Sequence, residues 1–129
     1  MAKGVSIKFK SYLETIPKLL EIIKFGSELK KHDKIILKPS LRNSESTNTS
    51  AEFVEAVLKF CLQNKAPESQ VLIAEGSDGE DTEQMFEKNK YKALAEKYSI
   101  GLMDLNTAEV DEILNGEFLK FGSIFYPKI

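Results

Sequence analysis

The chain alternates between short apolar runs and longer amphipathic stretches, separated by polar loops. Residues 34–38 and 71–74 are predicted strands, because positions 35–37 and 71–74 carry apolar side chains on consecutive positions, as strands covered on both faces do. Residues 5–9 alternate strictly between apolar and polar side chains, which predicts a half-buried strand. Residues 100–105 predict a shorter strand. The pattern at residues 110–114 fits a helix or a strand, and both alternatives stay open.

Apolar residues recur at helical spacing between these runs. Pro17 is tolerated only near the start of a helix, which places the first helix start near residue 15. Thr49 stands three positions before Glu52, the spacing of a capping box. The predicted helices cover residues 15–26, 49–62, 81–88 and 91–98, and residues 118–126 are expected to be extended.

The order of strand and helix along the chain predicts an α/β fold. We expect a mostly parallel, Rossmann-like sheet with helices on both faces, within a single domain of residues 1–129. Right-handed crossovers place the strand-to-helix loops at the carboxyl edge of such a sheet, where ligands bind in open α/β folds. Lys38, Glu75 and Asp104 each end a predicted strand. All three are therefore expected at that edge.

The candidate ligand-binding residues lie in the loops that follow two of these strands. Lys38 offers a positive charge for a carboxylate or phosphate. Polar donors and a helix N-terminus near Thr49 are expected beside it. The predicted weak anion site comprises Lys38, Ser40, Thr49, Glu75, Ser77 and Asp78. The alternative for Lys38 is a salt bridge to Glu75, which would make the lysine a structural residue.

The loop after residue 74 also carries two glycines and four acids. Gly76 and Gly79 do not have the spacing of a dinucleotide-binding fingerprint, and the surrounding acids would repel phosphate. Carboxylates at this density could bind Mg²⁺ or Ca²⁺. Because Asp78 and Asp81 stand just before a predicted helix, capping of its free N–H groups is the favoured interpretation. No metal site is predicted.

Composition narrows the functional classes further. The formal net charge is −2 and basic residues are scattered, which gives no electrostatic case for nucleic-acid binding. No apolar run approaches the ~20 residues that span a bilayer, and an apolar signal core is lacking, so a cytoplasmic location is expected. With Cys61 and His32 as the only residues of their types, neither a zinc site nor a Ser-His-Asp relay is expected.

Several of these segments, in this order and spacing, resemble the family called domain of unknown function 362 (DUF362). The segment from Lys34 to Pro39 ends in a Lys-Pro pair, and residues 71–77 combine an apolar strand with Glu75, Gly76 and Ser77. The similarity extends over most of the chain. It continues through residues 49–58, 82–87, 91–95 and 103–106.

The resemblance implies that the chain is the N-terminal portion of a longer family domain. Family members usually continue into a second half, and many carry a ferredoxin-like module whose cysteines hold iron–sulfur clusters. A single cysteine cannot hold such a cluster, which normally needs about four ligands. No cofactor is therefore expected in this chain, and a cluster would belong to a missing C-terminal half or a partner chain.

Two functions remain open at this stage. The first is a ligand-binding half-domain of a redox-associated or metabolic protein, with a weak anion site at the carboxyl edge of the sheet. The second is a non-enzymatic interaction module without a small-molecule site. The residues do not decide whether the protein is an enzyme, because fold alone does not determine function.

Overall fold

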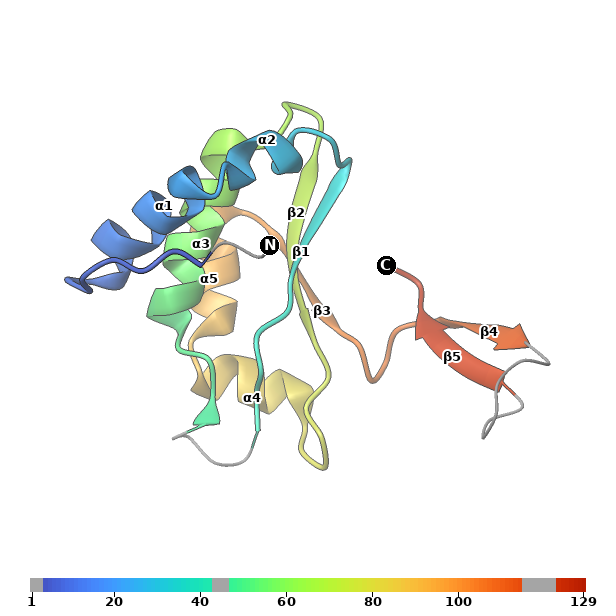
Figure 1. Ribbon diagram of the computed structural model, residues 1–129. Helices are drawn as coiled ribbons and strands as arrows, with labels where there is room; N and C mark the ends of the chain where they lie inside the picture. Colours follow the sequence, from blue (N-terminus) through green and yellow to red (C-terminus); the bar gives the residue numbers. More distant parts are fainter. Residues whose placement is uncertain (1–3, 43–46, 115–122) are drawn as a thin grey trace.

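The computed structural model describes residues 4–42, 47–114 and 123–129 and shows a mixed α/β protein (Figure 1). The predicted α/β class is confirmed. The helices are α1 (Tyr12–Ile22), α2 (Phe25–Leu29), α3 (Ala51–Asn64), α4 (Thr82–Lys88) and α5 (Tyr91–Tyr98). The strands are β1 (Lys34–Leu37), β2 (Gln70–Glu75), β3 (Gly101–Asp104), β4 (Val110–Leu114) and β5 (Ser123–Pro127).

The strands form two separate sheets. β1, β2 and β3 form a parallel sheet in the order β1-β2-β3, with Ile35 opposite Val71 and Ile73 opposite Leu102. β4 and β5 form an antiparallel two-stranded ribbon. The open question at residues 110–114 is thus settled as a strand. The predicted extended segment 118–126 lies partly outside the described residues, and its described part belongs to β5.

The helices lie on one face of the parallel sheet, so the expectation of helices on both faces is wrong for the described part of the chain (Figure 1). Ile35, Val71 and Ile73 are buried with residues of α3 and α5, whereas Ile36, which points the other way, is 41% exposed. The topology explains this arrangement. Both crossovers move in the same direction across the sheet, and right-handed crossovers of that kind leave their helices on the same side.

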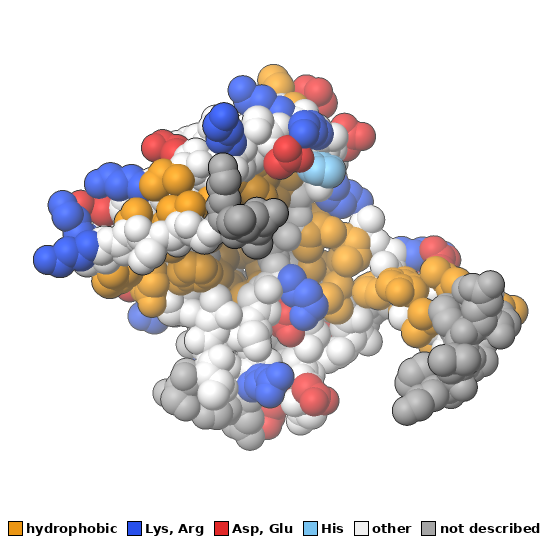
Figure 2. All heavy atoms as spheres, in the orientation of Figure 1, with side chains coloured by type: hydrophobic (Ala, Val, Ile, Leu, Met, Phe, Trp, Pro, Cys, Tyr) orange, Lys and Arg blue, Asp and Glu red, His pale blue; other side chains and the backbone are white. Residues whose placement is uncertain are grey.

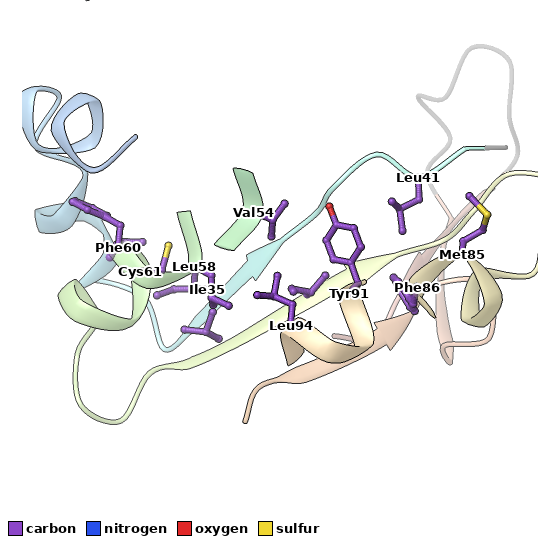
Figure 3. Packing of buried hydrophobic residues seen from close by; sticks show 13 residues of the cluster. Ile35, Leu41, Val54, Leu58, Phe60, Cys61, Met85, Phe86, Tyr91 and Leu94 are labelled. Atoms are coloured by element: carbon purple, nitrogen blue, oxygen red, sulfur yellow. The ribbon is translucent and has the colours of Figure 1, made fainter. Parts of the chain in front are cut away.

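The core therefore lies between this face of the sheet and the helices (Figure 3). Val54, Leu58 and Cys61 of α3 are buried in it, and Val57 packs against it while partly buried, so the predicted apolar face of this helix is confirmed. Burial raises the pKa of the Cys61 thiol to about 11, as expected of a structural rather than a reactive cysteine.

The strand predicted at residues 5–9 is absent. These residues have no regular secondary structure, and Val5 and Phe9 are 41% and 58% exposed. A strand needs a neighbouring strand for its backbone hydrogen bonds, and residues 5–9 pair with neither β1 nor β3, the two edge strands of the sheet. Alternation within five residues indicates which side chains could be buried, but it does not indicate which strand they would pair with.

The first helix also differs from its prediction at both ends. α1 starts at Tyr12 because the Ser11 side chain accepts a hydrogen bond from the Glu14 N–H at 3.2 Å, and Pro17 is accommodated inside the helix. The chain then turns at Lys24, which has a φ of 58°, and Gly26 lies within α2. A Cβ on Gly26 would stand 3.0 Å from Asn64 Oδ1, so this glycine serves the close packing of α2 on α3.

Candidate functional site

Lys38 and Glu75 meet at the carboxyl edge of the parallel sheet. Lys38 follows β1 directly and Glu75 ends the neighbouring β2, and Lys38 Nζ lies 2.7 Å from Glu75 Oε2. The predicted salt bridge is confirmed. The two partners differ in environment, because the Lys38 side chain is 62% exposed and the Glu75 side chain only 7%. The ammonium group therefore remains accessible to solvent while the carboxylate lies beneath the surface.

Tyr91 lies on the buried side of this site. It is the first residue of α5 and fully buried, and its hydroxyl donates a 2.7 Å hydrogen bond to the carbonyl oxygen of Thr49. Burial, and secondarily the charge of the nearby Glu75 carboxylate, raise the pKa of Tyr91, so the phenol stays neutral. The buried phenol thereby connects α5 to the loop that leads into α3.

Two hydrogen bonds between Ser40 and Thr49 hold together the two ends of the loop between β1 and α3. We call this pair of hydrogen bonds the Ser40–Thr49 clasp. The Ser40 N–H donates to Thr49 Oγ1 at 3.0 Å, and the Thr49 N–H donates to the Ser40 carbonyl at 2.9 Å. The capping-box spacing indicated that Thr49 is the N-cap of α3, and this prediction is wrong. Ser50 takes that role and accepts a hydrogen bond from the Phe53 N–H at 3.2 Å. The structure thus brings Ser40 and Thr49 together.

Ser77 and Asp78 have different roles in the second loop. Ser77 is buried; its N–H donates to Thr82 Oγ1 at 3.1 Å and its hydroxyl donates to the Leu41 carbonyl at 3.3 Å. These bonds join the second loop to the first. Asp78 is exposed, and Asp81 caps α4 by accepting a hydrogen bond from the Gln84 N–H at 3.0 Å. Capping by Asp81 is confirmed, whereas no cap by Asp78 is seen.

Asn106 holds this second loop in place, a role that was not predicted for it. Its amide Nδ2 donates to the Ser77 carbonyl at 2.9 Å and to Thr82 Oγ1 at 3.1 Å. A Cβ added to Gly76 would stand 2.5 Å from Asn106 Oδ1. Gly76 is therefore needed because it leaves room for the asparagine. No local pattern reveals such a contact, which joins residues 30 positions apart in the sequence.

Gly76→Ala is expected to destabilise the protein by about 1–3 kcal/mol, because the added methyl group would push Asn106 away from its partners. Gly4→Ala is the matched control, since nothing lies within 4 Å of a Cβ at Gly4. Urea denaturation of both variants, together with Asn106→Ala and the double variant, measures the effect. The two substitutions should be less than additive, because both disturb one contact. Additive effects would contradict a shared contact.

Two surface pockets border the clasp between Ser40 and Thr49. One, of about 240 Å³, is lined by Lys38, Pro39 and Thr49 together with apolar side chains of β1 and α3. The other, of about 300 Å³, lies at the N-terminus of α3 and is lined by Thr49, Ser50, Lys88 and Lys90 among others. The exposed lysine head, loop polar groups and first-turn N–H groups of a 14-residue helix thus lie around one stretch of surface.

The described residues contain no group of three or more His, Cys, Asp or Glu side chains that could hold a metal ion. Within the same residues, no helix has the length and apolar character needed to cross a membrane. The chemistry that the site does offer is electrostatic: one accessible ammonium group beside a buried carboxylate, with hydrogen-bond donors nearby.

Comparison with known proteins points to a family but to no described activity. No curated protein matches the chain significantly, and neither does any solved structure. A family model described as domain of unknown function (DUF362) matches residues 18–127, a span that includes the whole parallel sheet and the Lys38–Glu75 pair. The resemblance noted in the sequence is confirmed, and the chain belongs to the DUF362 family.

Proposed function

We propose that the chain is a ligand-binding domain of a metabolic or redox-associated protein, with a weak site for a small anion at the carboxyl edge of its parallel sheet. The observation that carries this proposal is the Lys38–Glu75 pair. A buried carboxylate holds the lysine at the end of β1, while 62% of the lysine side chain stays exposed. An ammonium group fixed in this way can meet a carboxylate or phosphate as a point charge.

The surrounding loop supports the same interpretation. The Ser40–Thr49 clasp positions the loop that enters α3, and the first N–H groups of that helix have no partners within the helix. The partial positive charge at a helix N-terminus favours an anion. Glu75 acts in the opposite direction, because its negative charge compensates Lys38 at 2.7 Å. Affinity should therefore be on the order of millimolar, about −4 kcal/mol.

An NMR titration with phosphate and small carboxylates tests this site. Amide signals of Ser40, Thr49 and Ser77 should shift in the wild type, and the shifts should be largely lost in Lys38→Ala. Lys97→Ala is the matched control: Lys97 Nζ also lies 2.7 Å from a glutamate oxygen, that of Glu55, and its side chain is also 62% exposed. This variant should titrate like the wild type. Equal shifts in wild type and Lys38→Ala would remove the anion site and leave Lys38 a structural partner of Glu75.

An interaction module is the second candidate function, and the β4–β5 ribbon favours it. Several of its large apolar side chains are exposed, including Leu114 at 74%. Exposed apolar surface of this kind is typical of contacts with another protein. The titration above separates the two functions, because an interaction module without a small-molecule site should show no shifts that depend on Lys38.

A further inference from the structure

The β4–β5 ribbon stands apart from the rest of the protein, on the side of the parallel sheet that faces away from the helices (Figure 1). Its apolar side chains point to both of its faces. The pairing of Glu112 with Phe125 places Val110, Leu114 and Phe125 on one face, and the pairing of Ile113 with Ile124 puts these two on the other. Val110, Ile113, Leu114, Phe125 and Tyr126 are all exposed.

A two-stranded ribbon with this exposure needs a partner surface. An isolated hairpin is marginally stable at best in water, and stable sheets of this size have at least one face packed on something else. β4 and β5 make extensive contacts with one another. Figure 2 shows hydrophobic side chains on the surface of the ribbon and on the part of the molecule beside it.

The parallel sheet leaves part of its second apolar face uncovered. Ile36 is exposed on it, and Leu72 and Met103, which project to the same face from β2 and β3, are partly exposed. β1 and β3 are both edge strands of the sheet. One chain therefore carries both an apolar ribbon and an apolar sheet face, and neither is buried within the described part of the chain.

The chain as a whole exposes more surface than a compact monomer of its mass. A folded monomer of 14.5 kDa has about 6,900 Å² of accessible surface by the usual scaling with mass. This chain exposes 9076 Å², an excess of roughly 2,200 Å². Two chains that each buried such an excess would share an interface in the range of roughly 2,000–5,000 Å² that obligate dimers have. The ribbon and the open sheet face contribute to this excess, which is of the size that a permanent contact buries.

We propose that the partner is a second copy of this chain, and that the β4–β5 ribbon of each copy packs on the open sheet face of the other. Charge complementarity supports this pairing. Glu112 lies among the apolar residues of one ribbon face, and Lys34 lies beside Ile36 on the sheet face. Neither side chain has an ion-pair partner among the residues that the structure describes. A ribbon placed on the sheet can bring the two charges together.

Symmetry favours a second copy over a different protein. In a two-fold symmetric dimer, the ribbon of each copy would cover the sheet face of the other, so the same contact occurs twice. Both ribbons and both sheet faces are then buried, and no such surface is left to bind a third copy. Each copy has a formal net charge of only −2, so long-range repulsion between copies is weak.

Sedimentation analysis of the full chain over a range of concentrations tests the proposal. The wild type should have the mass of a dimer. Phe125→Glu and Ile36→Glu should each raise the dissociation constant by on the order of 30-fold or more, because each places a charge at the centre of the contact. Leu13→Glu is the control, since Leu13 is also about half exposed but lies on α1. This variant should remain dimeric. Circular dichroism verifies that every variant is folded.

Two mixing experiments identify the surfaces. A mixture of Phe125→Glu and Ile36→Glu chains retains one intact ribbon-on-sheet contact, so it should form heterodimers although neither chain forms homodimers. Lys34→Glu and Glu112→Lys should each weaken the dimer, and the double variant should restore it. A wild-type chain that stays monomeric at about 100 µM overturns the proposal, whichever other protein covers the ribbon. A dimer that neither Phe125→Glu nor Ile36→Glu weakens overturns it too.

Discussion

Leu58→Asp is expected to destabilise the protein by about 4 kcal/mol or more, enough to unfold most of a domain of ordinary stability. Leu58 is fully buried in α3, within the cluster that includes Ile35, Val54 and Ile73. An aspartate at this position would place a carboxylate among apolar side chains without a hydrogen-bond donor to receive it. Loss of packing and burial of a charge both lower the free energy of unfolding.

Lys59→Asp is the matched control for this prediction. Lys59 is the next residue of α3 but is exposed, so the same new side chain would stay in water. Surface substitutions of this kind usually change stability by no more than about 0.5 kcal/mol. Circular dichroism and urea denaturation of both variants make the comparison. A Leu58→Asp variant that unfolds at the same urea concentration as Lys59→Asp would show that this face of α3 is not in the core.

The second large effect is expected at Tyr91, where two substitutions separate the contribution of the ring to stability from that of the hydroxyl. Tyr91→Ala should cost about 3–5 kcal/mol, because it removes a fully buried ring that packs near Phe86, 6.5 Å away between ring centroids. Tyr91→Phe keeps the ring and removes only the hydrogen bond to the Thr49 carbonyl, which should cost about 1–2 kcal/mol. Thermal and urea unfolding measure both losses.

The difference in stability between the wild type and Tyr91→Phe should also depend on pH. Because burial and the Glu75 charge raise the pKa of Tyr91 in the folded state, the unfolded chain loses the phenol proton first as the pH rises above about 10. The free energy of unfolding then falls with increasing pH. Tyr91→Phe lacks this loss, so its stability should approach that of the wild type at alkaline pH. A constant gap between the two proteins would show that the hydroxyl is not buried beside a carboxylate.

Periodic patterns in the sequence were sufficient for most elements of the fold. The consecutive apolar residues at positions 35–37 and 71–74 became β1 and β2, and the apolar stripe from Val54 to Cys61 became the buried face of α3. Lys38 and Glu75 were predicted as neighbours because parallel strands with ordered crossovers place their ends at the same edge. Each of these features depends on a repeat within one element or on a general rule of connection.

What the sequence did not predict depends on contacts between distant segments. The apolar run at Ile36 suggested cover on both faces, but the direction of both crossovers decides which face is covered, and local sequence does not encode it. The role of Asn106 depends on the loop that contains Ser77, which is distant in the sequence. Thr49 and Ser50 are both good N-cap residues, and the clasp with Ser40 decides between them.

The contact between Gly76 and Asn106 also bears on how this family can vary in sequence. With only 2.5 Å between a Cβ at position 76 and the asparagine oxygen, a larger residue at one position requires a smaller one at the other. The two positions should therefore change together among relatives that keep this loop conformation. A lineage that has lost the asparagine is released from the requirement for glycine, and its loop between β2 and α4 is free to diverge.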